Sequence, residues 1–139
     1  MKNFVEIINQ NPIYMNDWSN AHKENIIDDF EELYWKSEEE KTEIIKGYDV
    51  INILFASYGN ANYTGDAWVL FEKNGKLYEI NAGHCSCYGL EGQWEPEEVQ
   101  LIELENRLLN GTFGEDDWSD NNFKEELCKF LGVEFRKNI

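Results

Sequence analysis

Apolar side chains recur at two different spacings along the chain, and the change of spacing separates helical from extended segments. Over residues 2–47 they lie three and four positions apart, which is the spacing of one helix face. The boundaries follow from proline, glycine and capping residues. We predict a helix over 2–10 that ends at Asn11-Pro12. A second helix is expected to be capped by Asp17 or Ser19 and to bury apolar residues as far as Tyr34. A third is expected over 38–46 and ends at Gly47.

Between residues 50 and 82 the apolar residues alternate, as they do in a half-buried strand. Residues 67–73 and 76–82 flank Asn74-Gly75, the strongest two-residue signature of a β-hairpin. A type I′ turn there would fix the register. It would place Phe71 opposite Tyr78, Val69 opposite Ile80 and Ala67 opposite Ala82, all on one face. A strand over 50–58 precedes the hairpin, and the residues over 58–66 have the composition of a turn.

The last third of the chain predicts two more helices. Glu95-Pro96 is expected to open the first, which ends at Gly111. Asn121 or Asn122 is expected to cap the second, which ends at Gly132, and 133–135 could add an edge strand. The fold class is therefore α+β: a three-stranded antiparallel meander (about 50–58, 67–73 and 76–82) packed on one face by N-terminal and C-terminal helices. We expect a single domain over 1–139, with a helical N-terminal segment (1–47), the meander and a Gly/Cys loop over 48–96, and a helical C-terminal segment (97–139).

Composition supports a folded domain and excludes several classes of protein. Apolar residues make up 42% of the 139 positions, which is far from a disordered composition. No apolar run approaches the length of a membrane span, and the N-terminal residues do not resemble a signal peptide. The three cysteines are too few for a disulfide framework. These features predict a protein of the reducing cytoplasm.

The net charge of −16, from 28 acidic and 12 basic residues, predicts which surfaces this chain can bind. Nucleic acids and anionic membranes bind through Lys and Arg, so we expect neither as a direct partner. We expect instead a protein with a basic surface, although the charge could also serve only solubility. The candidate acidic face consists of Asp28, Asp29, Glu38, Glu39, Glu40, Glu115, Asp116 and Asp117.

A second candidate site is the loop over 83–94, which holds two of the three cysteines and one of the two histidines. The loop residues whose side chains could take part in chemistry or ligand binding are His84, Cys85, Cys87, Tyr88, Glu91 and Trp94. His84, Cys85 and Cys87 are zinc-type ligands, but adjacent ligands point apart in a strand, so we expect no cofactor and keep zinc as an alternative. A cysteine nucleophile with His84 as its base is a further alternative. The third is structural: glycines for a sharp turn, and Cys and Trp as buried apolar groups.

Two stretches carry a resemblance to known proteins. Gly65-Asp66-Ala67-Trp68-Val69-Leu70-Phe71-Glu72, followed by His84-Cys85-Ser86-Cys87-Tyr88-Gly89-Leu90-Glu91-Gly92-Gln93-Trp94-Glu95-Pro96, resembles a group of uncharacterised short bacteriophage and prophage proteins. The resemblance implies a phage or mobile-element origin, and with it the cytoplasm of a bacterial host, and it brings no catalytic residue with it. Small acidic phage proteins are often inhibitors of bacterial defence, including anti-CRISPR proteins, which is an argument by association.

These observations predict a non-enzymatic accessory protein that binds and blocks a defence protein or another nucleic-acid-handling protein. One alternative is a binding protein for a nucleotide signal, or a small Cys/His or zinc-dependent enzyme, centred on 83–94. Another is a structural module that forms homodimers through an exposed hairpin edge or through its Trp-bearing face.

Overall fold

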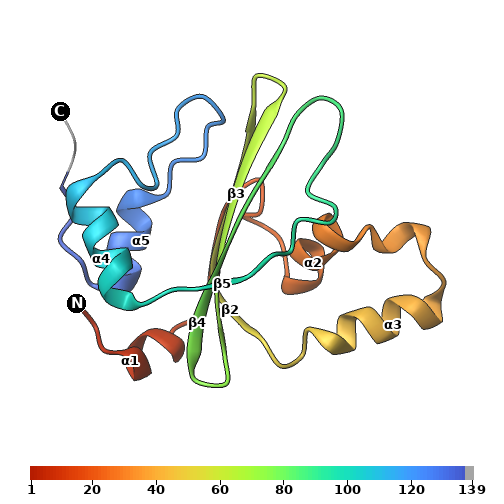
Figure 1. Cartoon of the computed structure of the whole chain (residues 1–139), viewed down its shortest axis with the longest axis horizontal. Helices are drawn as coiled ribbons and strands as arrows, with labels where there is room; N and C mark the ends of the chain where they lie inside the picture. The colour runs from red at the N-terminus through yellow and green to blue at the C-terminus, as the bar shows by residue number, and fades with distance from the viewer. Residues whose placement is uncertain (137–139) are drawn as a thin grey trace.

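The structure of the protein is a computed structural model that describes residues 1–136, so the last three residues of the predicted C-terminal segment lie outside the described residues. It is a mixed α+β fold built on one five-stranded sheet (Figure 1). The strands are β1 (Ile13–Asn16), β2 (Asn52–Ala61), β3 (Thr64–Lys73), β4 (Lys76–His84) and β5 (Glu97–Glu98), in that spatial order. β1 pairs with β2 in parallel, and the other pairs are antiparallel. The predicted α+β class and the meander β2–β3–β4 are confirmed, with two additional edge strands.

Helices cover both faces of the sheet, which makes the expectation of one covered face wrong (Figure 1). One layer holds α1 (Phe4–Ile8), α4 (Leu101–Asn110) and α5 (Lys124–Leu131). The other holds α2 (Lys23–Glu31), the short 3₁₀ helix η1 (Leu33–Trp35) and α3 (Glu38–Gly47). The reason lies in the second face of the hairpin, where Trp68, Leu70 and Leu77 are apolar and need a cover of their own.

The hairpin register is confirmed at every predicted pair. Phe71 lies opposite Tyr78, Val69 opposite Ile80 and Ala67 opposite Ala82. Asn74 and Gly75 both have positive φ, 53° and 79°, as a type I′ turn requires. Local turn chemistry and the apolar pattern favoured the same pairing, so they left no competing register.

One predicted turn and one predicted helix start are wrong because strand pairing continues further than the local composition indicates. The predicted turn over 58–66 is mostly strand, since β2 and β3 run to Ala61 and from Thr64, and only Asn62 and Tyr63 form the turn, both with positive φ. The predicted helix at Glu95-Pro96 starts later, at Leu101. Glu97 and Glu98 instead extend the sheet beside β4.

The predicted N-cap residues of two other helices are wrong. α2 starts at Lys23 with His22 as its N-cap, because residues 17–20 form turns after β1, so neither Asp17 nor Ser19 caps it. The last helix starts after Phe123, not after an asparagine cap. Residues 133–135 form no strand in the described stretch of the chain, whereas the predicted ends at Gly111 and Gly132 are confirmed as helix C-caps.

One buried ion pair joins the sheet to the C-terminal helical layer. Glu79 of β4 is 4% exposed, and its carboxylate accepts both hydrogen bonds of the Arg107 guanidinium at 2.8 Å. The indole Nε1 of Trp68 donates to the same carboxylate at 3.0 Å. No helix within residues 1–136 has the length and apolar character to cross a bilayer.

Candidate functional site: an acidic cleft

The residues of the predicted acidic face lie in three separate places. Asp28 and Asp29 belong to α2, Glu38, Glu39 and Glu40 form the first turn of α3, and Glu115, Asp116 and Asp117 lie in the loop between α4 and α5. The first two groups belong to one helical layer and the third lies next to the other. Each group therefore has to be judged by its own surroundings.

The acids at the start of α3 are largely explained by the helix itself. The Ser37 hydroxyl accepts from the backbone N–H of Glu40, and the Glu40 carboxylate accepts from the backbone N–H of Ser37, which makes a capping box. Glu38 pairs with Lys41 at 3.1 Å. Acidic side chains in a first helical turn also interact favourably with the helix dipole.

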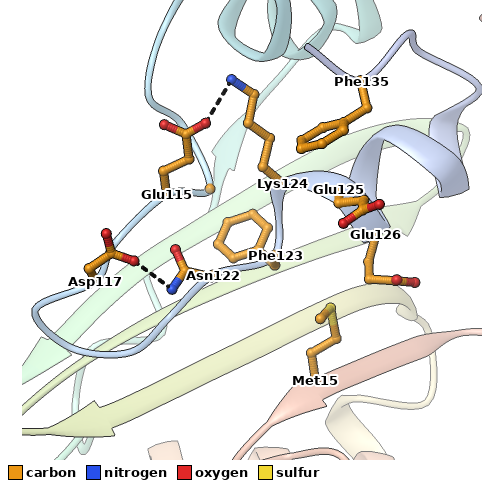
Figure 2. Close-up of a pocket in the computed structure, with 10 residues that line it drawn as sticks. Met15, Glu115, Asp117, Asn122, Phe123, Lys124, Glu125, Glu126 and Phe135 are labelled. Carbon is orange, nitrogen blue, oxygen red and sulfur yellow. Dashed lines mark hydrogen bonds and ion pairs between the residues drawn. The ribbon is translucent and has the colours of Figure 1, made fainter. Parts of the chain in front are cut away.

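The acids of the loop between α4 and α5 are held by neighbouring polar groups (Figure 2). Glu115 pairs at 3.2 Å with Lys124, a buried lysine that is 3% exposed. Asp117 accepts from the side-chain amide of Asn122 at 3.0 Å, and Asp116 accepts from the backbone N–H of Ser119 at 3.1 Å. These contacts fix the loop, and the charge of Glu115 is compensated by Lys124.

The acids of α2 line a cleft of about 240 Å³ that, unlike the pocket of about 470 Å³ beside Glu115 and Asp117, has no lysine in its lining. The cleft lies between α2 and the loop over 83–94, and thus joins residues from both candidate sites. Its lining residues are Asp28, Asp29, Glu32, Tyr34, Tyr58, Gly89, Leu90 and Glu91. None of these is Lys, Arg or His, so the lining itself contains no cation to compensate the carboxylates.

A backbone hydrogen bond joins the two walls of this acidic cleft, and side-chain hydrogen bonds fix the loop that forms one of them. The backbone N–H of Gly92 donates to the carbonyl of Phe30 at 3.2 Å, which fastens the loop to α2. The Gln93 side chain bonds both backbone groups of Gly83, at 2.7 and 3.0 Å, and the carbonyl of Gly89 at 2.9 Å. Because the loop is anchored at these points, the cleft is a preformed feature of the fold.

Three of the cleft carboxylates are oriented by one protein donor each. Asp28 accepts from the backbone N–H of Leu33 at 2.7 Å, Asp29 from the indole Nε1 of Trp18 at 2.7 Å, and Glu91 from the backbone N–H of Gly89 at 3.2 Å. Each bond uses one of the two carboxylate oxygens. The second oxygen can accept a donor from a bound partner, and a guanidinium or ammonium group offers several.

Two groups that line the cleft have raised pKa values, and neighbouring carboxylates add to the effect of burial. Burial raises the pKa of Asp29 above its ordinary value, and the charges of Asp28 and Asp17 raise it further, against the opposing hydrogen bond from Trp18. Burial raises the pKa of Tyr58 to about 12, with added contributions from Asp29, Asp17 and Glu91. A bound cation would relieve this repulsion, so the cleft favours positively charged ligands.

Asp29→Asn is therefore expected to stabilise the protein slightly at neutral pH. A raised folded-state pKa means that the neutral form stabilises the fold and that this contribution is lost as the pH rises through the raised pKa. Asparagine keeps an acceptor for Trp18 and removes the charge. We expect a gain of a few tenths of a kcal/mol at pH 7, small because exposed charges are screened. Urea unfolding at pH 7 and at pH 3 measures it, and a variant that is less stable at pH 7 would contradict the repulsion.

Next to the cleft, two aromatic rings project into solvent. Tyr34 and Trp35 of η1 are 68% and 71% exposed, and their ring centroids lie 4.4 Å apart. The prediction that Tyr34 faces the core is wrong because α2 ends at Glu31, and the left-handed backbone of its C-cap Glu32 (φ 49°) redirects the chain. The sequence signal for this break is the capping box of Ser37 and Glu40, because a new helix that starts there requires the preceding helix to end before it.

The remaining residues of the 83–94 loop have structural contacts. The His84 Nδ1 lies 2.5 Å from the Tyr58 hydroxyl, while Trp94 packs edge-on against Phe30 and Tyr48, each at 5.1 Å between centroids. No hydrogen bond joins His84 to either loop cysteine within the described chain, and no group of three or more His, Cys, Asp or Glu side chains is arranged to hold a metal ion there. Tyr88 is 56% exposed.

Comparisons of the chain with protein-family models, with curated proteins and with solved structures found no match.

Proposed function

We propose that this protein acts by binding a basic protein surface through the acidic cleft and the adjoining Tyr34–Trp35 pair. The partner class is a bacterial host or defence protein that handles nucleic acid, and binding blocks its nucleic-acid site. The protein would then be a phage-type accessory protein of the bacterial cytoplasm, similar in action to anti-CRISPR inhibitors. The phage origin rests on the sequence resemblance, and the binding mode rests on the cleft.

The observation that carries the proposal is the combination of four carboxylates and exposed aromatic rings at one place. Asp28, Asp29, Glu32 and Glu91 line a preformed cleft, and Tyr34 forms part of its wall. Tyr, Trp and Arg dominate the binding energy of protein interfaces, and carboxylates pair with Arg in two-pronged geometry. An arginine from a partner could enter the cleft while the partner surface covers Trp35.

The placement of the basic residues strengthens the outward negative field. Lys23 directs its ammonium to the backbone carbonyls of Tyr48 and Ile51, each at 2.7 Å. Lys124 is buried, and Arg107 is committed to Glu79. These three basic side chains thus serve internal contacts, and the excess of 28 acidic over 12 basic residues is left to attract a basic partner.

The partner is expected to use its nucleic-acid-binding surface because that is where proteins concentrate Lys and Arg. A carboxylate-lined cleft would compete there with phosphate groups. The interaction should accordingly weaken steeply with salt, since charges are screened within about 8–10 Å at physiological ionic strength. It should also be displaced by added duplex DNA or RNA.

The test compares two triple variants that remove the same charge. Asp28→Asn/Glu32→Gln/Glu91→Gln neutralises the cleft, and Glu103→Gln/Glu105→Gln/Glu125→Gln neutralises acids of α4 and α5 on the other layer. Tagged wild type and both variants are used to capture partners from bacterial host lysate at low salt. We expect one basic partner that is retained by wild type and the control, is released by salt and by nucleic acid, and binds the cleft variant at least about tenfold more weakly.

Two outcomes would contradict this function. Equal loss of the partner from both triple variants would mean that only net charge matters. A partner that stays bound to the cleft variant, or that nucleic acid does not displace, would exclude competition at this cleft. We do not propose the enzymatic alternative, because no arrangement of His84 with Cys85 or Cys87 in the described chain favours it.

A further inference from the structure

Two of the three cysteines lie on one tight turn at the surface. Cys85 follows the last residue of β4 and forms an isolated β-bridge with Tyr88, so residues 85–88 fold back on themselves. Cys85 is half-buried and Cys87 is exposed, whereas Cys128 is buried in the core between the sheet and α5. The turn therefore presents two thiols, one intervening residue apart, on the surface of the molecule.

A contact within the turn points the side chain of Cys85 toward the backbone of Cys87. The backbone N–H of Cys87 donates to the Sγ of Cys85 at 3.3 Å. This hydrogen bond is the main cause that lowers the pKa of the Cys85 thiol, and the backbone of Tyr88 and the side chain of Cys87 act in the same direction. A thiol with a lowered pKa and access to solvent is the form of cysteine that attacks disulfides. Neither cysteine is paired in the structure.

We propose that Cys85 and Cys87 form a redox-active dithiol that reduces low-molecular-weight disulfides and closes into an internal disulfide. Cys85 is the attacking residue, because its sulfur is the one stabilised as the thiolate. Cys87 is the resolving residue, because it lies in the same turn with its backbone already at the Cys85 sulfur. The inference does not depend on the proposed binding function.

The exchange balances with glutathione disulfide as the co-reactant. The Cys85 thiolate attacks one sulfur of glutathione disulfide, the S–S bond breaks, and one glutathione leaves as a thiolate that takes a proton from solvent. Cys87 then loses its proton to solvent and attacks the Cys85 sulfur of the mixed disulfide. The second glutathione leaves, and the protein holds a Cys85–Cys87 disulfide. The net reaction oxidises two protein thiols and reduces one glutathione disulfide to two glutathiones.

The test incubates the full-length reduced protein with glutathione disulfide near pH 7.5 and follows intact mass over time. We expect wild type to lose the mass of two hydrogens, with peptide mapping that places the bond between Cys85 and Cys87. Cys87→Ser should instead accumulate one glutathione adduct on Cys85, since no resolving thiol is present. Cys85→Ser should react far more slowly, and Cys128→Ser should behave as wild type.

The variants distinguish the proposal from ordinary surface reactivity. A stable glutathione adduct on wild type, with no internal disulfide, would overturn it. So would a disulfide that involves Cys128, disulfide-linked dimers as the main product, or equal reaction rates for Cys85→Ser and Cys87→Ser. Circular dichroism of each variant shows whether the fold is retained, and alkylation under native conditions gives an independent rate for each thiol.

Discussion

Replacing Gly59 with alanine is expected to destabilise the protein by about 3 kcal/mol or more. A Cβ at this position of β2 would lie 2.4 Å from the carbonyl oxygen of Ser119 and 2.5 Å from the backbone nitrogen of Asn121. Both neighbours are backbone atoms of the loop between α4 and α5, which cannot move aside as a flexible side chain would. Either β2 or the loop has to shift as a unit.

The loop cannot move without breaking a buried polar network. The side chain of Asn121, which is fully buried, accepts at 2.6 Å from the Ser57 hydroxyl, which itself accepts at 2.7 Å from the Asn16 side-chain amide. Separation of the loop from the sheet would leave buried polar groups without partners, at roughly 1–3 kcal/mol for each group. This cost adds to the steric strain.

Urea unfolding followed by tryptophan fluorescence measures the effect, with Gly47→Ala as the matched control. Gly47 is the last residue of α3, and an added Cβ there meets no atom within 4 Å. The control is expected to change the free energy of unfolding by less than about 1 kcal/mol, in the stabilising direction. Equal effects of the two substitutions would show that the loop does not dock on β2 as described.

The second large effect is expected from Arg107→Met, which leaves Glu79 buried without its cation. Removing one partner of a buried ion pair costs about 3–5 kcal/mol. Because the Arg107 side chain is 37% exposed, we expect about 2–3 kcal/mol at pH 7. Arg136→Met is the control. Arg136 and Glu134 are both largely exposed, so the loss there should stay below about 1 kcal/mol.

The pH dependence of this effect has a definite sign. Burial opposes ionisation of Glu79, but the hydrogen bonds from Arg107 and Trp68 outweigh it and hold the pKa below its ordinary value of 4.5. A lowered folded-state pKa gives stability that is present above the ordinary pKa and is lost as the pH falls through the folded one. The difference between wild type and Arg107→Met should therefore be largest at pH 7 and shrink below about pH 4. A difference that is independent of pH would contradict the ion pair.

The sequence predicted the centre of the fold well because several local signals agreed there. Asn74-Gly75 and the alternating residues on either side of it specify the same hairpin, and the structure has that register. The edge strands were not predictable in this way. β1 and β5 are short, and each is defined by backbone pairing with a distant neighbour, so residues such as Glu97 and Glu98 give no local strand signal.

The candidate site was predictable only to a limited extent. The sequence singled out Asp28, Asp29 and Glu91 for different reasons, and the structure brings them into one cleft. Their meeting depends on how the 83–94 loop docks on α2, which is a tertiary contact with no sequence pattern. Tyr34 and Trp35 were missed because the apolar spacing of α2 continues through Leu33 into residue 34, while the helix itself ends at Glu31.

The most direct test of the central proposal is the location of cation binding on the protein. Isotope-labelled protein is titrated with an arginine-rich peptide at low salt, and amide chemical shifts are followed by NMR. We predict saturable changes concentrated at residues 28–35 and 89–91, which disappear in Asp28→Asn/Glu32→Gln/Glu91→Gln and at high salt. Changes centred on 115–126, or spread evenly over all acidic segments, would contradict the acidic cleft as the binding site.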